Sequence, residues 1–173
     1  RDSSVTGVQT CALPISPDEM SQKAMDLFMQ RMHCSQAVAA AGLESLGLER
    51  PEVIKSLGAF GGGVASSGRV CGCLTGAVAM LSGLFSRADP SGKESPLMWK
   101  LSSRMVRRFE ELTAEFGSVD CRDIARCDWR DREAVKEFYG QPDSRRVICR
   151  QLVGDTAQAL GEILERARAE GQL

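Results

Sequence analysis

The stretch Cys71-Gly72-Cys73-Leu74-Thr75-Gly76 decides how the rest of the sequence is interpreted. It follows a segment, residues 58–68, that is too rich in glycine for a stable helix interior. After the stretch, apolar residues recur at helical spacing as far as Phe85. Two thiols are therefore expected where a loop enters a helix, and the N–H groups of a helix start stabilise a thiolate.

Helical periodicity continues in both directions from this point. The sequence predicts long helices at about 17–31, 34–46, 74–85, 97–116 and 144–169, with short ones at 51–57 and near 132–138. No strand pattern stands out, and the length fits one domain. We therefore predict an all-α, single-domain bundle of about five helices, with the glycine-rich loop placed before the Cys71 helix.

The first residues of the chain lack the helical periodicity of the rest. Residues 5–15 resemble a translated sequencing-library adapter, lack an amphipathic period and are interrupted by Pro14. We expect residues 1–15 to be non-native and dispensable, and residues 16–173 to form the domain, starting with Ser16 as a helix cap. Cys11 is therefore not counted among the candidate site cysteines. The cytoplasm is the expected compartment, and the replaced start leaves export open.

Composition limits the function classes. The formal net charge of −1 argues against a nucleic-acid partner or an anionic membrane surface. The apolar run from Leu74 to Phe85 is too short to span a bilayer. The only histidine, His33, excludes His-rich metal sites. The six remaining cysteines are spaced neither as a zinc ribbon nor as a disulfide-stapled mini-domain.

The glycine-rich loop does not fit a nucleotide site. Gly61, Gly62 and Gly63 are followed by no Gly-Lys-Ser/Thr ending and preceded by no strand, so neither a P-loop nor a dinucleotide fingerprint is present. We interpret these glycines, with Gly72, as allowing close backbone approach to the sulfur site. They could also offer N–H groups to a bound cofactor.

The remaining cysteines differ in their predicted settings. Cys34 begins a predicted helix, Cys121 lies in a predicted loop, and Cys149 lies on the apolar stripe of the last helix, where it would pack as a small hydrophobe. Cys71 is expected to face the site. Cys73, two positions on, would face elsewhere on a regular helix.

Two further side chains are candidates for the site. Cys127 is expected to be a resolving thiol or an exposed spare. His33 could be a base or a ligand, but a solvent-facing side chain at a helix boundary is the favoured interpretation.

This arrangement resembles the redox-active C_GCAxxG_C_C family, which is defined by a Cys-Gly-Ala-x-x-Gly motif and four spaced cysteines. The matching residues, over about 24–164, are Cys34, Cys71, Gly72, Gly76, Cys121 and Cys149, and Cys73 stands where the family has alanine. The resemblance implies a helical redox protein that works with a redox partner protein or an oxidoreductase complex. A related domain in split-Soret cytochromes suggests an iron–sulfur centre.

Several mechanisms stay open on this basis. Cys34, Cys71, Cys121 and Cys149 could hold an iron–sulfur cluster for electron transfer or redox sensing, with Cys73 as an additional candidate ligand. The same residues could hold zinc. Alternatively, without any cofactor, Cys71 could be the nucleophile of thiol–disulfide exchange, with Cys73 or another cysteine resolving. The last alternative is a non-catalytic helical module with inert core cysteines. The sequence therefore leaves open whether the protein is an enzyme, is accessory to an oxidoreductase, or is neither. The cluster interpretation predicts that the four cysteines converge.

Overall fold

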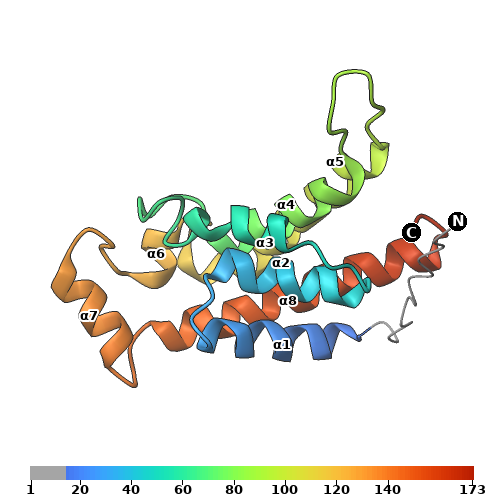
Figure 1. Cartoon of the computed structure of the whole chain (residues 1–173). Helices are drawn as coiled ribbons and strands as arrows, with labels where there is room; N and C mark the ends of the chain where they lie inside the picture. The colour runs from blue at the N-terminus through green and yellow to red at the C-terminus, as the bar shows by residue number, and fades with distance from the viewer. Residues whose placement is uncertain (1–14) are drawn as a thin grey trace, which may run out of the picture.

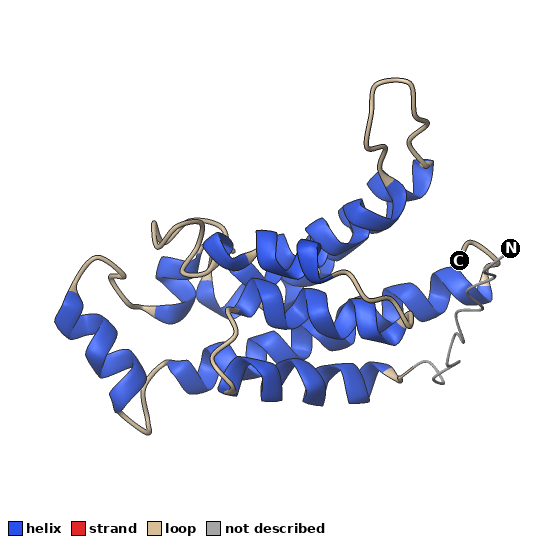
Figure 2. Ribbon diagram, in the orientation of Figure 1, coloured by secondary structure: helices blue, strands red, loops and turns tan. Residues whose placement is uncertain are grey.

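A computed structural model describes residues 15–173 of the chain, and this part is helical. It contains eight α-helices: α1 (Pro17–Met29), α2 (Cys34–Ser45), α3 (Pro51–Ser56), α4 (Gly72–Phe85), α5 (Pro96–Leu112), α6 (Cys121–Ala125), α7 (Arg132–Gly140) and α8 (Arg146–Ala169). Figure 2 shows only helices and loops in the described residues. The all-α prediction is confirmed, whereas the predicted number of about five helices is wrong. Helix α6 was missed because its five residues cover little more than one turn and show no period.

The first helix begins where the sequence predicts. The Ser16 hydroxyl accepts a hydrogen bond from the Glu19 N–H at 3.3 Å, and the Glu19 carboxylate accepts one from the Ser16 N–H at 2.7 Å. This capping box satisfies N–H groups that lack a partner within the helix. Residues 1–14, to which most of the adapter interpretation applies, lie outside the described residues. Ile15 is half-buried and packs against the main core.

Helix α2 lies at the centre of the bundle. Figure 1 shows α1 and α8 side by side along the molecule, and α2 packs against both of them and against α4. Its residues Ala37, Ala39 and Ala41 are fully buried. A helix that is apolar on all sides is suited to such an enclosed position. Helix α5 completes the main core by packing against α4 and α8.

Two glycines of the central stretch set the distance between α2 and α4. A Cβ atom on Gly72 would lie 2.5 Å from the sulfur of Cys34, and one on Gly76 would lie 2.8 Å from the backbone carbon atoms of Ser35. Residues four apart lie on the same face of a helix. Gly72 and Gly76 therefore allow the first turn of α4 to pack directly against the first turn of α2.

Helices α6 and α7 lie at one end of the bundle, away from the C-terminal end of α8 (Figure 1). They have a small core of their own, with Cys121, Ala125, Cys127 and Phe138 buried. The rings of Trp129 and Phe138 meet edge to face, with centroids 4.9 Å apart. This aromatic contact packs α7 against the turn that follows α6. Within residues 15–173 no helix combines the length and the apolar character needed to cross a bilayer.

Candidate functional site

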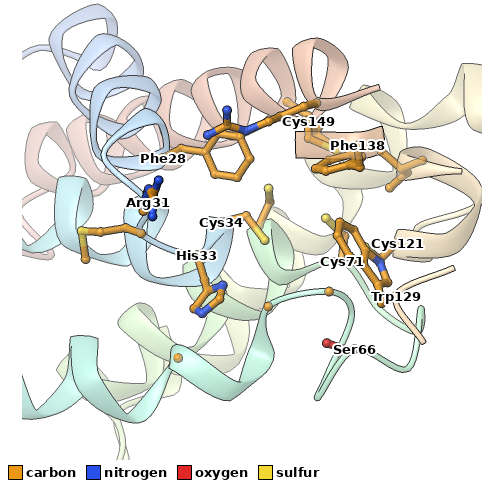
Figure 3. Close-up of a pocket in the computed structure, with 18 of the residues that line it drawn as sticks. Phe28, Arg31, His33, Cys34, Ser66, Cys71, Cys121, Trp129, Phe138 and Cys149 are labelled. Carbon is orange, nitrogen blue, oxygen red and sulfur yellow. The ribbon is translucent and has the colours of Figure 1, made fainter. Parts of the chain in front are cut away.

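Five cysteines line one cavity of about 890 Å³ at this end of the bundle: Cys34, Cys71, Cys73, Cys121 and Cys149. Figure 3 shows Cys34 near the middle of this space, with Cys71, Cys121 and Cys149 around it. The fold therefore brings the four cysteines singled out in the sequence to one cavity, although long stretches of chain separate them. All five are free thiols.

The cavity lies at the N-terminal ends of several helices. Cys34 is the first residue of α2, Cys71 is the N-cap of α4, and Cys149 lies in the first turn of α8. The N–H groups of a helix start carry a partial positive charge, which stabilises a thiolate or another anion nearby. Cys121 begins the short helix α6, not a loop as predicted. Three long helices thus direct the same favourable field into one space.

The prediction that Cys73 faces away from the site is not what the structure shows. Cys71 has φ −58° and ψ 137°, so it precedes the helix and is not part of its first turn. The rule that residues two apart diverge holds only inside a regular helix. Because the helix begins at Gly72, Cys71 and Cys73 both reach the cavity.

Cys34 is the thiol that this environment ionises most easily. Hydrogen bonding from the thiols of Cys71 and Cys73 lowers its pKa well below the ordinary value, and the backbone N–H of Ser35 acts in the same direction. The same contacts raise the pKa of Cys73 and Cys71, because each keeps its proton beside a Cys34 thiolate. Cys34 also lines the cavity and is half-buried, whereas Cys71 and Cys73 are buried.

Cys121 and Cys149 lie in a less favourable environment for a thiolate. Burial raises the pKa of Cys121 to about 12 and also raises that of Cys149. The indole N–H of Trp129 donates a hydrogen bond of 3.3 Å to the Cys121 sulfur, which acts in the opposite direction but is the smaller effect. No sequence pattern singled out Trp129, because its contact with Cys121 depends on the turn that follows α6.

The glycine-rich loop passes this cavity in an unusual backbone conformation. Residues 62–66 all have positive φ, and among them Val64, Ala65 and Ser66 are not glycine. Each L-residue in this conformation costs roughly 1–2 kcal/mol. Gly61 and Gly62 line the cavity, and a Cβ on Gly63 would lie 2.7 Å from that of Cys121. Strained backbone that persists beside a cavity is typical of functional sites.

Val64 offers a direct test of this strain. Val64→Gly should raise the free energy of unfolding by about 1 kcal/mol, because glycine adopts positive φ without the steric cost. The side chain is 40% exposed, so little burial is lost. Val64→Ala is the matched control and should gain less, since alanine keeps a Cβ. Urea unfolding measures both, and equal values for the two variants would contradict the assigned conformation.

The other predicted residues have different positions. Cys127 is buried in the small core of α6 and α7 and does not line the cavity, so it is not an exposed spare thiol. His33 is exposed at the start of α2, as predicted, and its ring lines the cavity mouth near Gly61. Within residues 15–173, no group of three or more His, Cys, Asp or Glu side chains is placed to hold a metal ion.

The chain matches one family model. That model is described as "Putative redox-active protein (C_GCAxxG_C_C)" and covers residues 32–163, which include all the cysteines of the cavity. No curated protein and no solved structure matches the chain. Since the match spans well over half of the sequence, the chain belongs to the redox-active C_GCAxxG_C_C family.

Proposed function

We propose that this protein transfers or senses electrons through an iron–sulfur cluster bound by Cys34, Cys71, Cys121 and Cys149. The observation that carries the proposal is that these cysteines, at the starts of four separate helices, line one cavity. A bound cluster would supply one-electron redox chemistry. The residues of this chain would provide the ligands, the surrounding charge and the exclusion of water.

The donor set fits such a group in its chemistry. Four cysteine thiolates are the usual ligands of iron–sulfur clusters. Five thiols line the cavity, and among the described residues no aspartate or glutamate lines it. Within residues 15–173 no three side chains already converge on one metal position, so the cysteines would have to move together when the centre binds.

The surroundings of the cysteines also suit a negatively charged centre. The N-terminal ends of α2, α4 and α8 would offset the negative charge of the thiolates. Burial raises the pKa of Cys149, so its thiolate is unfavourable there without a nearby cation. Metal binding at these thiols would therefore release protons and become stronger as the pH rises.

The proposal is tested on protein purified without oxygen. Iron and acid-labile sulfide should be present in about equal amounts, with broad visible absorption that dithionite bleaches and air restores. The bleaching is the decisive readout because it reports electron uptake by the centre. Colourless protein that contains only zinc, or no metal at all, would overturn the proposal.

A specific observation favours a second candidate, thiol–disulfide exchange with Cys34 as the attacking thiol. Its pKa is lowered by the neighbouring thiols, whereas the pKa of Cys71, favoured as nucleophile from the sequence, is raised. The Cys34 thiolate would attack a partner disulfide and form a mixed disulfide while one partner thiolate leaves. Cys71 or Cys73, after losing its proton, would then attack the Cys34 sulfur. The partner would leave with two thiols and this chain with one disulfide.

Alkylation of the metal-free protein tests the second candidate. At a pH of about 6, Cys34 should react with iodoacetamide roughly a hundredfold faster than Cys121, because a lowered pKa preserves the thiolate well below the ordinary value of about 8.5. The rate should fall only as the pH drops through the lowered pKa. A Cys11→Ser background and peptide mapping identify the modified thiol. Equal rates at Cys34, Cys121 and Cys149 would exclude this candidate.

A further inference from the structure

We propose that the outer part of the same cavity binds a small organic anion with a planar apolar body, held by Arg146 with help from Arg31. This site goes beyond the proposed redox centre, and its evidence comes from side chains other than the cysteines. It would place a small ligand next to Cys34 at the mouth of the cavity.

Apart from its thiols, the cavity wall carries charged side chains of one sign only. Among the described residues, the side chains that line it include Arg31 and Arg146 but no aspartate or glutamate. Neither arginine takes part in an ion pair within residues 15–173. Uncompensated guanidinium groups on the wall of a pocket attract carboxylate, sulfonate or phosphate groups, which they can bind through two parallel hydrogen bonds.

Arg146 is positioned but not satisfied by the protein. Its guanidinium carbon lies 5.6 Å from the ring centroid of Phe28 and 5.3 Å from that of Tyr139. Its Nε atom is buried and has no hydrogen-bond partner among residues 15–173. The adjacent Arg145 differs, because its Nε and Nη2 atoms donate to the carbonyl oxygen of Ile124 at 3.2 and 2.9 Å. Aromatic contacts thus orient the Arg146 guanidinium group. Because the Nε atom is shielded by the protein, a ligand in the cavity would be held by the Nη groups.

Arg31 supplies a second cation to the cavity wall, and its backbone has a positive φ. It has φ 73° in the turn between α1 and α2, a conformation that glycine would adopt at lower cost. This conformation ends α1, since the Met32 N–H donates to the Leu27 carbonyl oxygen at 3.1 Å, and Arg31 lines the cavity from that turn. Figure 3 shows Phe28, Arg31 and His33 on one side of Cys34, with Cys121 and Trp129 on the other. Arg31 and Trp129 thus lie on opposite sides of Cys34.

The other residues of the cavity wall indicate that the body of the ligand is apolar and aromatic. Phe28, Trp129, Phe138 and Tyr139 line the cavity. Its volume of about 890 Å³ lies in the range of pockets that bind small molecules, and such pockets combine apolar walls with a few placed polar groups. Aromatic walls with a guanidinium group beside them suit an aromatic carboxylate or sulfonate.

Two fluorescent probes that differ by one charged group test the proposal. Anilinonaphthalene sulfonate carries the anion, and N-phenyl-1-naphthylamine is the same body without it. Arg146→Gln should weaken sulfonate binding by about tenfold and binding of the neutral probe by less than about twofold, because only the charged hydrogen bonds are lost. Arg168→Gln is the control, since Arg168 is exposed on the same helix far from the cavity, and it should bind both probes as the wild type does.

Arg31→Gly keeps the test valid if Arg146→Gln unfolds. Glycine relieves the positive φ, so the melting temperature should not fall, while sulfonate binding should weaken by about threefold. Equal losses for the charged and neutral probes, or wild-type sulfonate binding in both arginine variants, would overturn the proposal. Iron content and colour, recorded on the same samples, report on the redox centre separately from anion binding.

Discussion

Gly76→Ala is expected to lower the free energy of unfolding by about 3 kcal/mol, since overpacking a core typically costs about 1–3 kcal/mol and rigid backbone leaves little room for relief. The new methyl group would lie 2.8 Å from the Cα and carbonyl carbon of Ser35, and closer still to its oxygen. Because these are backbone atoms, no side-chain rotation removes the clash, and α4 must move away from α2. Since α2 also packs against α1 and α8, the displacement spreads through the core.

Gly83→Ala provides the control on the same helix. A Cβ on Gly83 would meet nothing within 4 Å, so only helix propensity changes, and the variant should gain about 0.5–1 kcal/mol. Urea unfolding of both variants measures the difference. If both substitutions changed stability by the same amount, the close crossing of α2 and α4 would be contradicted. Gly76→Ala should also reduce any bound iron, because Cys34 moves with α2.

Serine substitution of each proposed ligand should remove the metal centre. Cys34→Ser, Cys71→Ser, Cys121→Ser and Cys149→Ser should each leave below about a tenth of the wild-type iron, because a serine hydroxyl stays protonated at neutral pH and is a poor ligand for this chemistry. Iron analysis and visible absorption after anaerobic purification measure the effect. The melting temperature should fall as well, since a group that binds only the folded chain stabilises it.

Two other cysteines provide the controls. Cys127→Ser should retain the iron, because Cys127 lies in the small core of α6 and α7 and does not line the cavity. Cys73→Ala should also retain it, because it restores the alanine that the family motif has at this position. Loss of iron in Cys73→Ala but not in Cys149→Ser would replace Cys149 by Cys73 in the ligand set.

The sequence was sufficient to predict most of the long helices and to show that the spacing of the cysteines resembles that of the family. Periodicity placed α2 and α8 within a few residues, and the Ser16 capping box followed a local rule that depends on neighbouring residues alone. The helix predicted at 97–116 was too long, because α5 ends at Leu112 and a separate 3₁₀ turn follows it. The assignment of Cys121 and Cys149 to one site came from the resemblance to the family. On its own, Cys149 lies on an apolar helix stripe and gives no sign of a role in the site.

Other parts of the site depend on tertiary packing and could not be predicted locally. The stacking of Arg146 between Phe28 and Tyr139 joins three separate helices. The orientation of Cys73 depended on Cys71 lying just before the helix, as its N-cap, and not inside it. The left-handed run includes Val64, a β-branched residue for which positive φ is strongly disfavoured, so no residue preference could indicate it.

The packing of α8 along α1 and α2 also limits when the site can form during synthesis. α8 is the last helix of the described chain, and it carries Cys149. While the ribosome is still making it, α1 and α2 lack their partner, and Cys34, Cys71 and Cys121 have no fourth cysteine beside them. Contacts between segments this far apart in sequence form late and slowly. A cofactor that requires all four thiols can therefore be inserted only after α8 has been synthesised and has docked.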